Sequence, residues 1–405
     1  MRIIWDYIKI SDGIRIIKAW GEESCLQIPE DIEGIPVTEI GPYAFSAAEV
    51  PRRFRINADE RQRLVTEWGV PVQNGSAGIW MTAEGSQAER QKTQEEPVAG
   101  NRLQAIRLPA TVTAIGDYAF YGCGKLEEVA FTDSLQRIGS GAFMGCGAVR
   151  RLEVIEDGSG KNSLYQMLSE LRYAIKLTIK SPGKKEEFVV PEYYETSVEN
   201  IPARILELHF QGTGYRYRQC FRDGKVWYRE YDELFRLAES QEPPEVLTQL
   251  AYCRIKYPNG LSGEAKKEYL EWFSAHVREA GEYFLKRDDL ESVRLICESG
   301  GFDGTAETEK RSQGNDGNRK VVADGAGDFY MASMGENVLG EEENVQQNGK
   351  AGGENGAGFW ESPRASLDVL MEMAGRMGRT EILSCLMDYR HRKQGSGRQK
   401  KVFEF

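Results

Sequence analysis

Several ionisable side chains gather near the middle of this 405-residue chain. The segment VVPEYYETSVENIPARI supplies Glu192, Glu195, Glu199 and Arg204, and His209 follows shortly after. Two carboxyl groups whose surroundings separate their pKa values can serve as acid and base in a hydrolysis. One hypothesis is therefore a hydrolase-like enzyme that uses this carboxylate and arginine cluster.

The same residues also allow a purely structural interpretation. Arg204 can pair with one of the glutamates and fix the loop, while tyrosines of the next segment, GYRYRQCF, cover a neighbouring domain. We expect that segment to be a strand with Tyr215 and Tyr217 on one face and Arg216 and Arg218 on the other. No catalytic nucleophile spacing or phosphate-binding loop accompanies the cluster, so the structural interpretation is favoured and no catalytic residue is assigned.

Histidine and cysteine usage argues against a metal or disulfide framework. The three histidines lie far apart, and the seven cysteines are widely spaced without a CxxC motif. We expect no metal and no cofactor, and we expect the cysteines to be buried thiols in a reducing compartment.

Charge and hydropathy restrict the partners. With 52 basic and 63 acidic residues the net charge is -11, which does not favour nucleic acid. No apolar run approaches the roughly 18 to 20 residues of a membrane span. Asp6, Lys9 and Asp12 interrupt the first twenty residues, where a signal peptide needs an apolar core. We expect a cytoplasmic protein.

A repeat of 23 residues organises the first part of the chain. The segments TAIGDYAFYGCGKLEEVAF and QRIGSGAFMGCGAVRRLEV match at eight positions, among them Phe120 and Phe143. An earlier copy places Ile40 75 residues before Ile115, which leaves an insertion of 52 residues, a predicted loop at about 46–101. A fixed period of this kind predicts a solenoid in which Phe120 stacks on Phe143.

The repeat pattern I-G-x-x-A-F-x-x-C-x-x-L resembles the BspA-like leucine-rich repeats of bacteria over about residues 26–155. The motifs PEYYE, ENIPAR and YRQCF also resemble segments of a family of bacterial leucine-rich-repeat proteins of uncharacterised function. This resemblance implies a binding scaffold and no particular reaction. Some BspA-like proteins are thought to be cell-surface adhesins, which gives a further alternative.

Stacked rungs bring outward-facing strand residues into register. We expect Glu127 to face Arg150 and Glu128 to face Arg151 at the 4.8 Å spacing of strands. This face is either a surface for a ligand or a ladder of mutually paired charges. It comprises Gln104, Arg107, Glu127, Glu128, Arg150, Arg151 and Glu153.

The rest of the chain is predicted as two further parts. Residues 159–260 are expected to form a mixed α/β module with a hairpin turning at Ser181-Pro182-Gly183. A second hairpin is expected from 204–210 to 215–221, followed by a strand at 226–231. Residues 261–300 and 364–393 are predicted as ankyrin-like helices, interrupted by a disordered, glycine-rich and acidic segment at 301–363 and followed by a tail at 394–405.

The predicted fold class is therefore α+β in several parts: a short leucine-rich-repeat β-solenoid at 1–158, the α/β module, and the helical region. The favoured function is non-enzymatic protein–protein interaction or scaffolding with an unknown protein partner. A hydrolase-like enzyme and a cell-surface adhesin remain the alternatives.

Overall fold

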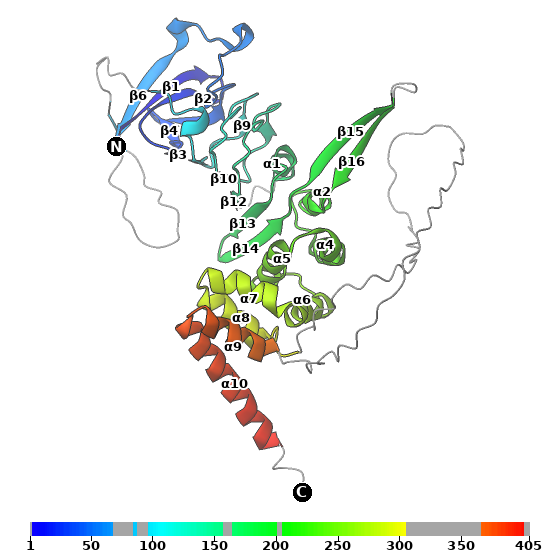
Figure 1. Ribbon diagram of the computed structural model, residues 1–405. Helices are drawn as coiled ribbons and strands as arrows, with labels where there is room; N and C mark the ends of the chain where they lie inside the picture. The colour runs from blue at the N-terminus through cyan, green and yellow to red at the C-terminus, as the bar shows by residue number, and fades with distance from the viewer. Residues whose placement is uncertain are drawn as a thin grey trace.

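The computed structural model describes residues 2–67, 84–86, 96–156, 164–200, 205–304 and 366–400. The solenoid occupies one end of the molecule and the helices occupy the other, and strands β13 and β14 lie between them (Figure 1). The last helix, α10, extends away from the body at the C-terminal end.

A parallel sheet of successive rungs forms one side of the solenoid. Leu26, Ile106, Val129, Leu152 and Leu177 occupy equivalent places on neighbouring strands, and all five are buried. In spatial order the strands are β3 (Cys25–Gln27), β8 (Ala105–Arg107), β10 (Glu128–Thr132), β12 (Arg151–Ile155), β13 (Ile175–Ser181) and the antiparallel β14 (Lys184–Val190).

A second sheet contains the other short strands of the rungs and an N-terminal hairpin. Ile40, Ile115 and Ile138 align across it, as the repeat offsets predict. Its order is β11 (Arg137–Ile138), β9 (Ala114–Ile115), β5 (Ile35–Ile40), β2 (Gly13–Gly21), β1 (Arg2–Ile10), β6 (Gln62–Glu67) and β7 (Glu84–Ser86), with β4 (Asp31–Ile32) beside β5.

Stacked phenylalanines form the interior behind the strands. The Phe45 and Phe120 rings are 5.2 Å apart and the Phe120 and Phe143 rings 4.9 Å apart, and all three are buried. The Cys146 thiol donates to the Phe120 carbonyl at 3.2 Å, so the cysteine satisfies a polar group of the rung before it. The predicted stacking of Phe120 and Phe143 is confirmed.

The insertion is not a loop throughout. Within it, β6 pairs with β1, and Leu64 and Val65 are buried. The polar composition of the insertion concealed this strand, which is stabilised by its tertiary pairing with β1 rather than by a local pattern.

The parallel sheet ends with a hairpin. β13 continues the register of β12, and β14 turns back at Pro182-Gly183, as the sequence predicts. The sheet thus runs on past residue 158. Helix α1 (Leu164–Glu170) takes the place of the Ala-Phe turn of earlier rungs and buries Leu164, Met167 and Leu168. Because β14 pairs with the free edge of β13 and packs against α5 and α2, the last rung of the solenoid has no exposed strand edge.

The second predicted hairpin, from 204–210 to 215–221, does not form. β16 (Ile205–Gln211) pairs with the preceding β15 (Tyr194–Asn200), and the two form a ribbon of their own. The following segment is helix α2 (Gly214–Gln219), and 226–231 contributes to helix α3 (Tyr228–Glu233) instead of a strand. Alternation of Tyr and Arg suits a strand. Adjacent Tyr217 and Arg218 are both buried in a helix here, because tertiary contacts override the local pattern.

Seven helices follow α3 in the part of the chain that the structure describes. Ser262 caps α6 by accepting a hydrogen bond from the Ala265 amide at 3.1 Å, and His276 separates α6 from α7. The helices are α4 (Phe235–Gln241), α5 (Pro244–Lys256), α6 (Gly263–Ala275), α7 (Val277–Lys286), α8 (Leu290–Ser299), α9 (Ser366–Arg376) and α10 (Thr380–Lys400).

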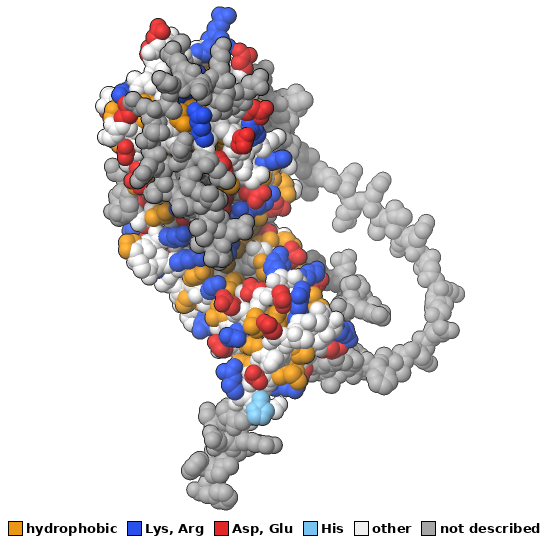
Figure 2. Space-filling view, turned by 90° about the vertical axis from the view of Figure 1, so that its left-hand side faces the viewer, with side chains coloured by type: hydrophobic (Ala, Val, Ile, Leu, Met, Phe, Trp, Pro, Cys, Tyr) orange, Lys and Arg blue, Asp and Glu red, His pale blue; other side chains and the backbone are white. Residues whose placement is uncertain are grey.

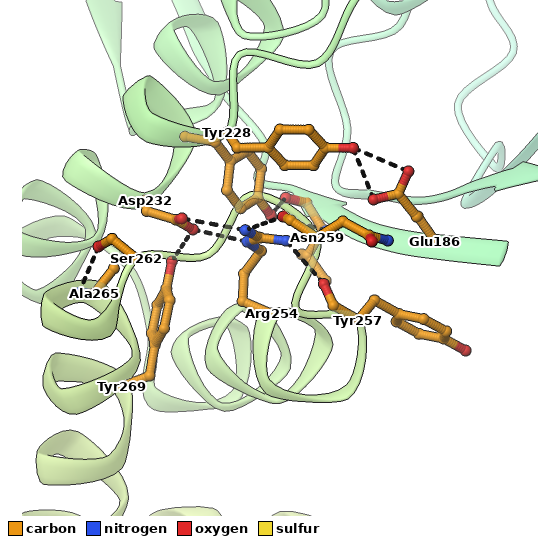
Figure 3. A network of polar contacts seen from close by, with 11 residues as sticks. Glu186, Tyr228, Asp232, Arg254, Tyr257, Asn259, Ser262, Ala265 and Tyr269 are labelled. Carbon is orange, nitrogen blue, oxygen red and sulfur yellow. Dashed lines mark hydrogen bonds and ion pairs between the residues drawn. The ribbon is translucent and has the colours of Figure 1, made fainter. Parts of the chain in front are cut away.

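A buried polar network joins α3, α5 and α6 (Figure 3). Arg254 donates to both carboxylate oxygens of Asp232 at 2.7 and 3.2 Å, and the Tyr269 hydroxyl donates to the same carboxylate at 2.8 Å. Beside it, the Tyr228 hydroxyl donates to Glu186 on β14 at 2.8 Å. These contacts link the helices to the last strand of the sheet.

The two ends of the segment between Gly304 and Ser366 lie next to each other. The Ser366 amide donates to the Gly304 carbonyl at 3.0 Å, so α9 begins where the chain after α8 leaves off. Most of the predicted disordered segment lies outside the described residues. The predicted tail is helical as far as Lys400. Its basic residues lie at the C-terminal end of α10, where positive charge interacts favourably with the helix dipole.

Lys and Arg side chains lie among Asp and Glu side chains on the face turned to the viewer in Figure 2. No helix among the described residues is long and apolar enough to cross a membrane.

Candidate functional site

The outward face of the parallel sheet carries a line of paired charges. Arg107 on β8 reaches across Ala130 on β10 to Glu153 on β12 at 3.0 Å, which the small alanine side chain permits. Lys180 on β13 contacts the same Glu153 at 2.7 Å. Burial alone would raise the pKa of Glu153, but the hydrogen bond from Lys180 and the charge of Arg107 outweigh it and lower the pKa.

The predicted pairing across the strands is confirmed in one of two cases. Arg151 contacts Glu128 at 3.0 Å, as expected. Glu127 lies opposite Arg150 in the backbone register, since the Arg150 amide donates to the Glu127 carbonyl at 3.0 Å, but the Glu127 side chain pairs with Arg151 at 3.5 Å instead. Arg150 turns away because its guanidinium stacks over the Tyr173 ring at 4.9 Å.

Gln104 completes the predicted face by accepting a hydrogen bond from the Ser24 hydroxyl at 3.2 Å. Most charged side chains of this face thus form ion pairs with one another.

A pocket of about 730 Å³ lies where the repeat region ends. Three segments line it: the last Ala-Phe turn at 141–147, the loop after α1 at 169–173, and the start of β15 at 192–195. Glu192 and Glu195, predicted from sequence, are both in its wall. Residues far apart in the chain thus form one concave site.

The pocket wall carries more negative than positive charge. Glu195 pairs with Arg172 at 2.8 Å, and Glu192 accepts a hydrogen bond from the Tyr194 hydroxyl at 2.9 Å. That hydrogen bond raises the pKa of Tyr194. Glu170, a third wall carboxylate, makes no ion pair with any described residue, and burial raises its pKa.

Large side chains with exposed surface surround the pocket. Met144 is 57%, Tyr194 56% and Tyr173 42% exposed. Exposed large apolar side chains grouped around a concavity are uncommon on a surface that has no partner.

A single buried arginine holds the pocket wall together. Arg218 is 1% exposed, and its guanidinium donates only to backbone carbonyls, at 2.7 to 3.0 Å. Its five acceptors belong to Leu168, Leu171, Tyr173, Pro191 and Gly214. Burial lowers the pKa of Arg218 to about 10. The loop after α1, the entry to β15 and α2 are therefore fixed by one side chain.

The other residues of the predicted middle-module cluster do not lie together in the pocket. Tyr217 packs inside against Tyr231 with ring centroids 4.8 Å apart, whereas Tyr215 lies outside and stacks on Phe210 at 4.2 Å. The side chain of Glu199 and all of Arg204 lie outside the described residues.

Sequence reasoning missed Met144, Tyr173 and Arg218. Met144 and Tyr173 follow no motif. The alternation of Tyr and Arg predicts a strand face for Arg218, and nothing local indicates that backbone carbonyls from other segments converge on its side chain.

The described residues contain no group of three His, Cys, Asp or Glu side chains that could hold a metal ion. The His276 ring instead stacks on Trp272, with centroids 4.9 Å apart.

Comparison with known proteins identifies the repeat. The model of the BspA type leucine-rich repeat region matches residues 97–175, with six copies. No curated protein matches.

Two solved structures are similar. One is a leucine-rich cell surface protein from Faecalibacterium prausnitzii, with 17% identity and a TM-score of 0.22, and the match covers 44% of this chain and 41% of that one. The other is a leucine-rich repeat protein of T. pallidum, with 19% identity and a TM-score of 0.19, covering 36% of this chain and 67% of that one. This chain therefore spans less than half the length of the first.

Together with the stacked 23-residue rungs, the match shows that residues 97–175 are a repeat region of the BspA-type leucine-rich family.

Proposed function

We propose that this chain is a non-enzymatic protein-binding module and that the pocket at the end of the repeat region holds the partner. The observation that carries the proposal is the exposure of Met144, Tyr173 and Tyr194 around that pocket. Aromatic and methionine side chains are enriched in protein interfaces, and a few residues, often tyrosines, supply most of the binding free energy there. A rigid wall, fixed by Arg218, reduces the entropy lost on binding.

The sheet face is a secondary part of the proposed surface. Glu127 and Arg151 remain 57% and 53% exposed, so a partner can reach them. Exposed pairs of this kind contribute about 0 to 1 kcal/mol each, so we assign them to orientation rather than to affinity.

Site-specific photo-crosslinking in the native host tests the proposal. A benzophenone side chain at position 194 should capture a reproducible protein, identified by mass spectrometry. The same group at Met387, which is 49% exposed on α10, is the matched control. Capture of the same proteins from both positions would contradict the assignment of the pocket.

We also propose that α7–α8 and α9–α10 are two ankyrin-like pairs. Support comes from the packing of α7 against α9 and of α8 against α10. Asp288 and Gly378, each two residues before the second helix of its pair, share a left-handed backbone with φ of 53° and 68°. The cytoplasmic location expected from the sequence stays a prediction, which fractionation of the native host would check.

A further inference from the structure

A row of aromatic side chains follows the turns of the solenoid. The rings of Phe54 and Tyr43 are 5.6 Å apart, those of Tyr43 and Tyr118 5.3 Å, and those of Tyr118 and Tyr121 6.0 Å. Tyr43 and Tyr118 are half-buried, and neither belongs to the interior cluster of the protein. We call Phe54, Tyr43, Tyr118 and Tyr121 the aromatic strip.

Two residues of the strip have a strained backbone. Tyr43 and Tyr118 have φ of 57° and 56°, in the left-handed region, and the equivalent residue of the next rung is Gly141 with φ of 61°. Glycine is the residue this turn accommodates without steric cost. Tyrosine there costs backbone free energy, and neither ring belongs to the buried core. Strain of this kind collects at functional positions.

The strip leads directly to the pocket. Gly141 lines the pocket, and a Cβ on Gly141 would lie only 2.7 Å from Cε1 of Tyr118. Met144, on the pocket rim, occupies the position in its rung that Tyr121 occupies in the rung before. Aromatic strip and pocket are therefore one continuous surface that runs across successive rungs.

The charge of the pocket wall defines what can enter it. Its ionisable acids are Glu170, Glu192 and Glu195, and its one arginine, Arg172, is engaged by Glu195. Glu170 and Glu192 make no ion pair with a described residue, and their carboxylates lie in the same wall as the exposed ring of Tyr194. The Arg150 guanidinium already stacks over the Tyr173 ring, so the ring of Tyr194 is the one left for a partner. Carboxylates next to aromatic rings favour a cationic side chain.

We propose that this surface binds an extended segment of a partner protein that inserts one lysine or arginine into the pocket and lays apolar side chains along the aromatic strip. The inference depends on the proposed function and specifies its ligand. Tyr43 and Tyr118 stack on one another at 29° between ring planes, so they present edges rather than open faces. Ring edges and gaps fit apolar side chains better than they fit the flat face of a sugar.

Peptide display on the full chain tests the proposal. Random 12-residue peptides are selected for binding, and the selected peptides are measured by fluorescence anisotropy. We expect lysine or arginine to be enriched at one position, with apolar residues on one side of it. Affinity should fall about tenfold in Glu170→Gln and in Glu192→Gln, since each change removes a partner of the cation.

Tyr118→Gly tests the strip without endangering the fold. Glycine already occupies the equivalent turn at 141, so the thermal midpoint should stay the same or rise while peptide affinity falls several-fold. Met387→Ala, on α10, should leave the affinity unchanged.

The possible results separate the two proposals. Peptides that need Tyr194 but show no basic residue and no response to the glutamate changes would overturn the ligand class and leave the binding pocket intact. Failure of the selection to give any peptide sensitive to Tyr194→Ala would overturn both.

Discussion

Arg218 and Arg254 are both fully buried, and they solve the problem of a buried cation differently. Arg254 has a carboxylate partner, Asp232; burial lowers the pKa of Arg254, but the hydrogen bond to that carboxylate outweighs the effect and raises it. Arg218 has only carbonyl oxygens, so desolvation prevails and its pKa falls to about 10. Arg254 joins helices to one another, whereas Arg218 shapes the pocket.

Arg218→Lys should lower the free energy of unfolding by about 2 to 4 kcal/mol. Lysine has three donors on one nitrogen and cannot reach five carbonyls, so buried acceptors lose their partners. Urea unfolding measures the loss. Arg216→Lys, an exposed position in the same helix, is the control and should change stability by less than about 0.5 kcal/mol. Equal effects at the two positions would contradict the role of Arg218.

Residue-level prediction from sequence succeeded where the repeat fixed the environment. The offset of 23 places Phe120 under Phe143 and Glu128 beside Arg151, because neighbouring rungs share one register. It could not find Arg218 or Tyr173, whose roles depend on segments that meet only after folding. For the pocket, sequence indicated the two glutamates and missed the arginine and the exposed aromatic and methionine side chains beside them.

At the scale of elements, the line of charges across β8, β12 and β13 should respond to acid. The folded-state pKa of Glu153 is lowered, so its stabilising contribution is present above the ordinary value of 4.5 and is lost as the pH falls through the folded value. Glu153→Gln should therefore destabilise at pH 7 and match the wild type at low pH. Urea midpoints across this range measure it. Glu127→Gln, 57% exposed, should show almost no such difference.

The junction between β14 and the helices should depend on Asp232. Asp232→Asn leaves Arg254 buried without a counter-charge and should cost about 3 to 5 kcal/mol. Glu233→Gln in the same helix removes an exposed pair and should cost less than about 1 kcal/mol. Adding Arg254→Met to Asp232→Asn should recover part of the loss. A double variant that loses the sum of the two single changes would show that no coupling exists.

Element prediction failed mainly after residue 190. The hairpin β13–β14 was found because its turn contains Pro182-Gly183, but the alternation in YRYRQ also fits a helix whose buried side is set by Tyr231 and backbone carbonyls. Local pattern and propensity cannot decide such a segment, since the deciding contacts come from elsewhere in the chain.

At the scale of the whole molecule, the contact between Gly304 and Ser366 predicts that the chain between them is dispensable for folding. Replacing its 61 residues by about four Gly and Ser residues should preserve the helical region and raise the free energy of unfolding by about 2 kcal/mol. Circular dichroism and urea unfolding check this. Loss of the helical signal would show that the removed segment contributes to the fold.

That closure also sets an order of events during synthesis. At about 5 to 20 residues per second, a ribosome needs roughly 3 to 12 seconds to translate the 61 residues between Gly304 and Ser366. Throughout this interval the emerged α7 and α8 lack the α9 and α10 against which they pack in the finished protein. Their apolar sides, with Val293 and Ile296, are then open to chaperones, and also to the same helices of neighbouring nascent chains on a polysome.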